Sequence, residues 1–229
     1  MFKQWLGQWV QRIGVFVLFG LIISAASLIA FAALADEVGE QDTLARFDLA
    51  LANALHEQIQ PGQVTFFIVV SLFGYQLLYT WSALFALGLL LRKRRADLAL
   101  WLTALAGGVL LNQLLKALFV RPRPFFIEPI VNEANYSFPS GHAMLSLIAY
   151  GLAAYLIASM VRSITARTLI GFLAVLVIIV IGISRMYLGV HYFSDVIGGF
   201  IAGTMWLTTC ITAREVMRRR GLIDSAQRR

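Results

Sequence analysis

The sequence predicts an all-α polytopic membrane protein, and two observations carry that prediction. Of the 229 residues, 59% are hydrophobic and only 14% are charged, and the mean hydropathy is +0.78. This composition is typical of an integral membrane protein and excludes an ordinary soluble domain. Six apolar runs are each long enough to cross a hydrocarbon core of roughly 30 Å as a helix. No linker rich in Ser, Gly or Pro interrupts the chain, so we expect one domain over residues 1–229.

The six apolar runs are expected to be six transmembrane helices. The first, over residues 13–35, ends in Ala33-Leu34-Ala35, which resembles a signal-peptidase site. Its length of about 23 residues exceeds the roughly 7–15 of a signal-peptide core, and its removal would leave an odd number of spans. We therefore predict a retained span. The other five are expected at residues 64–91, 98–120, 142–161, 168–187 and 193–213.

The segment between the first two spans predicts a helix of another kind. Its apolar residues recur at spacings of three and four, as Leu44, Phe47, Leu51, Leu55 and Ile59. This pattern indicates an amphipathic helix, which we expect to lie along the outer membrane interface. His56 and Glu57 are interpreted as part of its solvated polar face, because nothing pairs with them at motif spacing.

Basic residues mark one side of the membrane. They lie before the first span, in the loops after the second and fourth spans, and after the sixth, as Lys3, Arg12, residues 92–95, Arg162, Arg167, Arg214, Arg218–Arg220, Arg228 and Arg229. The positive-inside rule makes this side cytoplasmic, with both termini there. The opposite loop, residues 36–63, carries six carboxylates against the single Arg46. Topology thus explains the net charge of +7, and we expect a lipid bilayer, not nucleic acid, as the partner.

A first polar cluster lies where the third span ends, on the side opposite the basic loops. Lys116 and Arg123 are about two helical turns apart, and prolines flank Arg123. Snorkelling explains a lone lysine at a span end equally well, and it is the better explanation for Arg121. Together, however, Lys116, Arg123 and Arg185 match the oxygens of a phosphoryl group, which arginine can bind in a bidentate fork.

The second cluster, Pro139-Ser140-Gly141-His142, begins the fourth span. Ser140 is a good N-cap, and Gly141 allows a ligand to approach the backbone closely. The free N–H groups of this first turn form an anion site, with His142 beside it. Taken alone, the tetrapeptide is also explained as a capped helix whose first turn contains a histidine.

The third cluster contains His191 and Asp195, which share a helix face at positions i and i+4. The carboxylate can hold one ring nitrogen, which leaves the other as a nucleophile or base. The alternative for Asp195 is a favourable charge at a helix N-terminus. Arg185 falls off this face on a straight helix, so Gly189 is expected to mark a turn.

In chain order, the clusters read Lys-x6-Arg-Pro, Pro-Ser-Gly-His and Ser-Arg-x5-His-x3-Asp, within residues 116–195. This order resembles the tripartite signature of the type 2 phosphatidic acid phosphatase, or lipid phosphate phosphatase, superfamily, and the size resembles its bacterial phosphatidylglycerophosphatase B type. The resemblance implies a phosphatase without metal or cofactor in the bacterial inner membrane, with its active site at the periplasmic face. The implied substrates are outer-leaflet lipid phosphates or diphosphates, such as undecaprenyl diphosphate, phosphatidylglycerophosphate and phosphatidate.

The resemblance also implies a role for each motif residue. His191 would attack phosphorus and form a phosphohistidine, Asp195 would orient His191, and His142 would protonate the leaving oxygen and then activate water. The phosphate would be held by Lys116, Arg123, Ser140, Gly141 and Arg185. Glu128 and Glu133 lie in a loop without supporting ligands, and we expect them to be solvated or to gate the site.

Two other functions stay open at this point. A lipid phosphotransferase would pass the phosphoryl group from the same phosphohistidine to an acceptor lipid such as lipid A. A headgroup transporter or binder would use the cations without the histidines, but the spacing of His191 and Asp195 argues against it, since a binder needs no oriented neutral imidazole. The single Cys210 lies in an apolar run and is interpreted as a core residue. No oligomeric state is predicted.

Overall fold

The computed structural model describes residues 14–40 and 43–222, and within these ranges the regular structure is entirely helical. The helices are α2 (Val15–Glu40), α3 (Thr43–Gln58), α4 (Pro61–Leu72), α5 (Gln76–Leu91), α6 (Arg95–Phe119), α7 (Gly141–Ala158), α8 (Ile164–Tyr187) and α9 (Phe193–Arg219). Six stretches of the described chain are long and apolar enough to cross a membrane, with α4 and α5 together forming the second. The predicted all-α class and the six spans are confirmed. Ile13, where the first span was expected to begin, and the basic residues at positions 3, 12, 228 and 229 lie outside the described residues.

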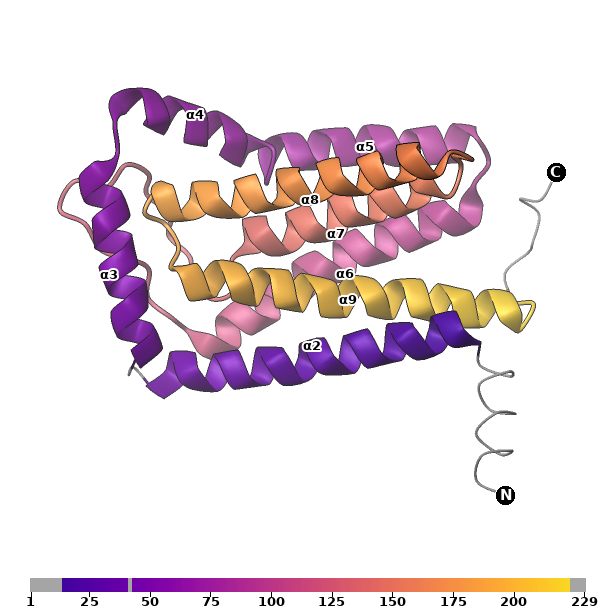
Figure 1. Ribbon diagram of the computed structural model, residues 1–229, viewed down its shortest axis with the longest axis horizontal. Helices are drawn as coiled ribbons and strands as arrows, with labels where there is room; N and C mark the ends of the chain where they lie inside the picture. The colour runs from indigo at the N-terminus through magenta and orange to yellow at the C-terminus, as the bar shows by residue number, and fades with distance from the viewer. Residues whose placement is uncertain (1–13, 41–42, 223–229) are drawn as a thin grey trace, which may run out of the picture.

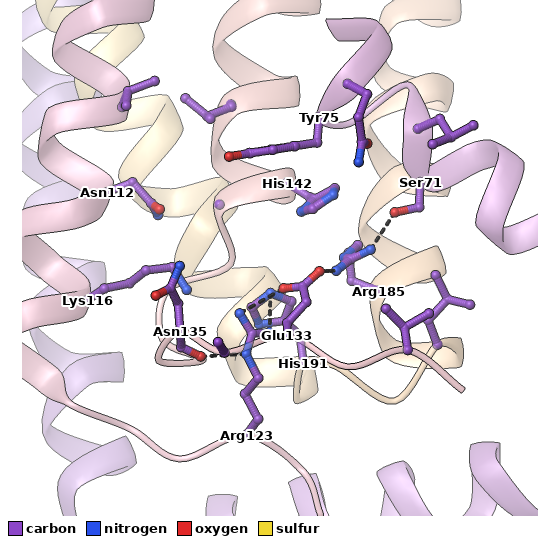
Figure 2. Close-up of a pocket in the computed structure, with 18 of the residues that line it drawn as sticks. Ser71, Tyr75, Asn112, Lys116, Arg123, Glu133, Asn135, His142, Arg185 and His191 are labelled. Carbon is purple, nitrogen blue, oxygen red and sulfur yellow. Dashed lines mark hydrogen bonds and ion pairs between the residues drawn. The ribbon is translucent and has the colours of Figure 1, made fainter. Parts of the chain in front are cut away.

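The second predicted span, residues 64–91, is confirmed as a span, but it consists of two helices, α4 and α5, instead of one. α4 ends at Leu72, and α5 begins at Gln76 after a turn in which Gly74 N donates to Ser71 O at 2.9 Å. Other side chains approach this turn closely, because a Cβ at Gly74 would lie 2.6 Å from Cγ2 of Ile181 and 2.9 Å from Cδ2 of His142. The break places Ser71 and Tyr75 beside His142 (Figure 2). The hydrophobic pattern of the sequence did not indicate this arrangement.

α7 lies at the centre of the bundle. Half of the 18 residues of α7 are buried, whereas only four of the 26 residues of α2 are buried. α7 packs against α6, α8 and α9. Figure 1 shows α2 running alongside α9 on one flank of the molecule. The core contains fully buried Trp101, Phe138, Met144, Ile148 and Leu152, whereas large apolar side chains remain exposed on the outer helices. This distribution suits a bundle whose outer surface is solvated by lipid.

α3 runs across one end of the bundle instead of along it (Figure 1). It is present where the amphipathic helix was predicted, between the first and second spans. Its buried residues are Asp48 and Ala52. At this same end lie the loop after α6, the N-terminus of α7 and the turn between α8 and α9, so α3 faces the region that holds the sequence motifs.

The opposite end of the bundle carries basic residues of the described chain, in the α5–α6 and α7–α8 turns. A fully buried carboxylate, Asp97, holds this end together: its Oδ2 lies 2.6 Å from Arg94 Nε, and its Oδ1 accepts from Arg214 near the end of α9. The two ends therefore differ in chemistry, since basic turns mark one end and the pocket lined by charged residues described below marks the other.

Candidate active site

Residues from all three sequence clusters line one pocket of about 400 Å³. Its wall includes Lys116 from α6, Arg123 from the following loop, Gly141 and His142 at the start of α7, Arg185 from α8 and His191 before α9. Figure 2 shows His142, Arg185, His191 and Arg123 converging on a common space. The clusters thus form one site, although they lie on different helices.

Close packing of α9 on α7 brings the second and third clusters together. A Cβ at Gly199 would lie 2.6 Å from Ser140 O, and one at Gly203 would lie 3.0 Å from Met144 O. Ser140 N also donates to Asp195 O at 2.9 Å. The expected turn before His191 is present, since Gly189 has a φ of +69°, which a side chain would strain. The glycines therefore set the geometry of the site without contributing polar groups.

His191 is held at both ring nitrogens. Its Nδ1 lies 3.4 Å from Asp195 Oδ2, and its Nε2 lies 3.2 Å from Arg123 Nη1. Because a guanidinium can only donate, Nε2 must be the unprotonated acceptor and Nδ1 must carry the proton. Burial, followed by the charges of Arg123, Arg185 and Lys116, lowers the pKa of His191 well below its ordinary value. The ring is therefore neutral at neutral pH.

Asp195 is fully buried and lies behind His191, outside the wall of the pocket. Tyr192 N donates to its Oδ2 at 2.8 Å, and Arg121 Nη1 lies 2.5 Å from its Oδ1. The prediction that Arg121 snorkels to the interface is wrong. α6 ends at Phe119, and the next residue, Val120, is left-handed with a φ of 49°. The chain then turns the Arg121 guanidinium inward, over the ring of Tyr192 at 4.5 Å.

Glu133 occupies the space between two arginines. Its Oε2 lies 2.8 Å from Arg123 Nη2, and its Oε1 accepts from Arg185 Nη2. Burial alone would raise the pKa of Glu133, but the charges of Arg185 and Arg123 hold it below its ordinary value, so the side chain is a carboxylate. The expectation of a solvated Glu133 is wrong, because long-range folding of the loop supplies the partners that its sequence neighbours lack. A gating role for Glu133 stays a prediction.

Lys116 and Arg185 are almost fully buried at the pocket. Lys116 Nζ donates to Tyr136 O, and Arg185 Nη1 donates to Ser71 Oγ in the broken second span. The polar groups with which Lys116, Arg123 and Arg185 interact come from α4, from the loop after α6 and from the turn before α9.

The start of α7 supplies His142, Gly141 and Ser140. The ring of His142 stacks on Tyr75 at 5.3 Å between centroids, and Gly141 packs against Asn112, whose Oδ1 would lie 2.9 Å from an added Cβ. Ser140 is the residue before α7, as predicted, but its side chain makes no capping hydrogen bond. Ser140 Oγ and Arg185 Nε are buried donors that reach no hydrogen-bond partner among the described residues. Such groups are rare in folded proteins and suit a site that binds an acceptor.

Several contributors to the site were not found by sequence reasoning, namely Asp48, Ser71, Tyr75, Asn112 and Arg121, and the partners of Glu133 were not found either. Two of them left a signal. Asp48 lies on the apolar face of its helix, four residues after Leu44, where a carboxylate requires a partner. Asn112 precedes Lys116 by one turn and so shares its face. Ser71 and Tyr75 left none, because only the break in the second span brings them to the pocket.

A sequence profile described as the PAP2 superfamily matches residues 96–219, which include all three clusters. The chain belongs to the PAP2 superfamily. Among curated members, this PAP2 protein is 35% identical over 119 residues to phosphatidylglycerophosphatase B of Bacillus subtilis, an alignment that covers 52% of this chain and 58% of that one. It is 27% identical over 146 residues to undecaprenyl-diphosphatase of Sulfolobus acidocaldarius, covering 62% and 66%. The matched regions thus span less than two thirds of either curated relative.

Two solved structures have a similar fold. The crystal structure of a transmembrane PAP2 type phosphatidylglycerolphosphate phosphatase from Bacillus subtilis superposes with a TM-score of 0.77 at 28% identity, and covers 85% of this chain and 96% of that one. The crystal structure of Aquifex aeolicus LpxE superposes with a TM-score of 0.57 at 22% identity, over 72% and 94%, which supports the fold alone. Within residues 14–40 and 43–222, no group of three His, Cys, Asp or Glu side chains could hold a metal ion.

Proposed function

We propose that this PAP2 protein is a membrane lipid phosphatase that hydrolyses phosphomonoester or diphosphate headgroups through a phosphohistidine. One observation carries the proposal: Arg123 and Arg185 together bind a carboxylate, that of Glu133, beside the neutral ring of His191. An anion position next to a lone-pair nitrogen is what attack on phosphorus requires. The names of the relatives, a phosphatidylglycerophosphatase and an undecaprenyl-diphosphatase, support a lipid phosphate as the substrate.

In the first step, His191 Nε2 attacks the terminal phosphorus and the bond from phosphorus to the leaving oxygen breaks. Lys116, Arg123 and Arg185 neutralise the charge on the phosphoryl oxygens, and those oxygens displace Glu133 from the two arginines. The unpartnered donors Ser140 Oγ and Arg185 Nε, with the N–H groups of the first turn of α7 at Gly141, complete the oxygen contacts. Asp195 keeps the proton on Nδ1 and stabilises the positive charge that the ring acquires.

In the same step, His142 gives a proton to the leaving oxygen. It then takes a proton from the water that attacks the phosphohistidine, which releases inorganic phosphate and restores His191. Stacking on Tyr75 limits rotation of the His142 ring. When the substrate is a lipid monophosphate, the leaving group is the lipid alcohol. When it is a lipid diphosphate, the leaving group is the lipid monophosphate.

We further propose that the pocket opens at the outer face of a bacterial inner membrane. It lies at the end of the bundle opposite the basic turns, and the positive-inside rule assigns those turns to the cytoplasm. The substrates would then be lipids of the outer leaflet. Charge asymmetry between the two ends is the support for this orientation.

The test is a panel of purified lipids offered to the protein in detergent micelles, namely phosphatidate, phosphatidylglycerophosphate and undecaprenyl diphosphate. We expect release of inorganic phosphate, its loss in the His191→Asn variant and its retention in His56→Asn. His56 is the matched control, because it stacks on Phe126 in a separate surface hollow. Release from no lipid overturns the proposal. Phosphate transfer to an added acceptor lipid, without release to water, identifies a phosphotransferase instead.

A further inference from the structure

We infer that Asp48 on α3 is a positioning residue for the reaction at His191, and that it acts through Arg121 and Asp195. The inference rests on the proposed function of His191 and adds to it a residue outside the three motifs and outside the region that the PAP2 profile matches. It also gives the crosswise helix α3 a part in the chemistry.

Asp48 is a buried carboxylate whose two oxygens are both engaged with the start of α9 and with Arg121. Ser194 N donates to Oδ1 at 3.0 Å, Ser194 Oγ donates to Oδ2, and Arg121 Nη2 lies 2.8 Å from Oδ2. Only 1% of Asp48 is exposed to solvent. A carboxylate so deeply buried is costly unless it is paired, so its position is determined by these contacts.

Arg121 joins this carboxylate to the one behind the proposed nucleophile. Its Nη1 lies 2.5 Å from Asp195 Oδ1 and 2.7 Å from Ser194 Oγ, while its Nη2 points to Asp48. One guanidinium is therefore shared between two buried carboxylates. The contacts form a continuous chain from α3 to the imidazole, in the order Asp48, Arg121, Asp195 and His191.

The charges of this chain explain why the reaction would depend on Asp48. Two carboxylates and one guanidinium leave a net charge of −1 behind His191. If Asp48 lost its charge, Arg121 would neutralise Asp195 alone and the net charge would be zero. The imidazole would then lose the negative neighbour that stabilises its cationic form during attack on phosphorus, and Nε2 would become a weaker nucleophile.

Other charged groups also face His191 and set the background against which this effect acts. They are Arg123 and Glu133 from the loop, Lys116 from α6, Arg185 from α8 and His142 from α7. None of them contacts Asp48 directly. A change at Asp48 therefore reaches His191 through the chain of contacts and leaves the phosphate-binding cations in place.

The competing explanation is that Asp48 merely caps α9. The variant Asp48→Asn separates the capping role from the electrostatic role. Its amide oxygen can still accept from Ser194 N, but the negative charge of the carboxylate is absent. We expect Asp48→Asn to lower kcat about 10–100-fold, the range found when the outer partner of a metal-binding histidine is removed, with little change in KM for the lipid. Glu57→Gln is the control, since it removes an exposed carboxylate from the same helix.

The decisive measurement is the pKa of His191 in the detergent-solubilised protein, obtained by NMR titration of ¹⁵N-labelled histidine. The chain has only three histidines, so each signal can be assigned by substitution. Asp48→Asn should lower the pKa of His191 below the wild-type value, and the double variant Asp48→Asn/Arg121→Gln, which restores the charge of −1, should raise it again and recover part of kcat.

The possible outcomes separate the two proposals. If the wild type releases no phosphate from any lipid, the proposed function fails, while the titration still decides the role of Asp48. An unchanged pKa of His191 in Asp48→Asn, or a double variant no better than the single one, rejects the inference. If neither variant folds, as judged by gel filtration and circular dichroism, Asp48 is a structural cap and the inference is equally rejected.

Discussion

The guanidinium of Arg123 donates toward the nitrogen of His191 that is proposed to attack phosphorus, with 3.2 Å between Nη1 and Nε2. Nη1 of the same arginine also lies 2.6 Å from Val190 O, and its Nη2 lies 2.8 Å from Glu133. Arg123 thus both binds an anion and fixes the protonation state of the histidine. A phosphoryl group that replaced Glu133 would meet the ring on its unprotonated side.

The first prediction concerns pH. Because burial and then Arg123 lower the pKa of His191, the ring stays neutral as pH falls through about 6.5, the ordinary value for histidine. We expect the acidic limb of kcat/KM to lie below that pH. A ³¹P titration of the free lipid phosphate supplies the ionisation of the substrate, which must be subtracted from the profile.

The same shift predicts how stability depends on pH. Below about pH 6.5 the unfolded chain binds a proton at this histidine and the folded protein does not, so the free energy of unfolding should decrease as pH falls below that value. Removal of the side chain in His191→Asn should flatten this dependence in chemical unfolding measurements. An acidic limb at or above pH 6.5 that NMR assigns to His191 would contradict both expectations.

The second prediction separates the two histidines. His191→Ala should abolish turnover and any trappable phosphoenzyme, because the covalent bond to phosphorus is proposed to form at Nε2 of His191. His142→Ala should slow monophosphate substrates by about 10²–10⁴-fold, since an alkoxide leaving group needs a proton. Diphosphate substrates should be affected less in burst kinetics, because a lipid phosphate is a weaker base. Labelled phosphoenzyme that persists in His191→Ala would refute this division of roles.

The third prediction concerns Glu133, whose carboxylate contacts Arg123 and Arg185 and would compete with phosphate for them. Glu133→Gln should strengthen inhibition by inorganic phosphate several-fold, because a neutral amide is displaced from the arginines more readily than a carboxylate. Glu128→Gln is the control, since Glu128 is an exposed carboxylate of the same loop. Weaker inhibition in Glu133→Gln would mean that Glu133 holds the arginines in place instead of competing for them.

The fourth prediction is metal independence. The proposed site meets the phosphoryl charge with Lys116, Arg123 and Arg185, so activity should persist in excess EDTA. Phosphate release is measured with the chelator and again after magnesium is added. Loss with EDTA and recovery with magnesium would show that a metal ion does the work assigned to these cations.

The fifth prediction tests the orientation in the membrane. In a Cys210→Ala background, a cysteine at Asn132 should react with a membrane-impermeant thiol reagent in intact cells, and one at Arg92 should not. Both positions are exposed, and they lie at opposite ends of the bundle. The reverse labelling pattern would place the pocket in the cytoplasm and exclude outer-leaflet lipids as substrates.

Some elements followed from local pattern alone. The apolar runs gave the six spans because a helix in lipid must satisfy its own backbone, so length and hydropathy suffice. The spacing of His191 and Asp195 gave their contact, because positions i and i+4 are neighbours on a helix surface. The break at Gly74 was not predicted, because the side chain of His142, which lies close to Gly74, is far away in the sequence.

The charged residues show where sequence reasoning stopped. Arg121 was assigned to the interface, and Glu133 to solvent or to a gating role, because their partners were not recognised in the sequence. Those partners are Asp48 and Asp195 for Arg121, and Arg123 and Arg185 for Glu133. The burial of an ionic group depends on whether an opposite charge meets it in the folded state. Whether two such charges come into contact depends on how the helices and loops pack in three dimensions.

By itself, the sequence determined that this protein is an all-α bundle with six apolar spans, one amphipathic helix between the first two spans and three polar clusters that resemble the PAP2 signature. Tertiary structure alone decided that the clusters share one pocket, that Glu133 sits between its arginines and that Asp48 reaches the rear of the site through Arg121. The physical reason is the distance along the chain over which each kind of interaction acts. Hydropathy and helical period act between near neighbours, whereas the pairing of buried charges depends on which helices pack together, here through the close contact of α9 with α7 at Gly199 and Gly203.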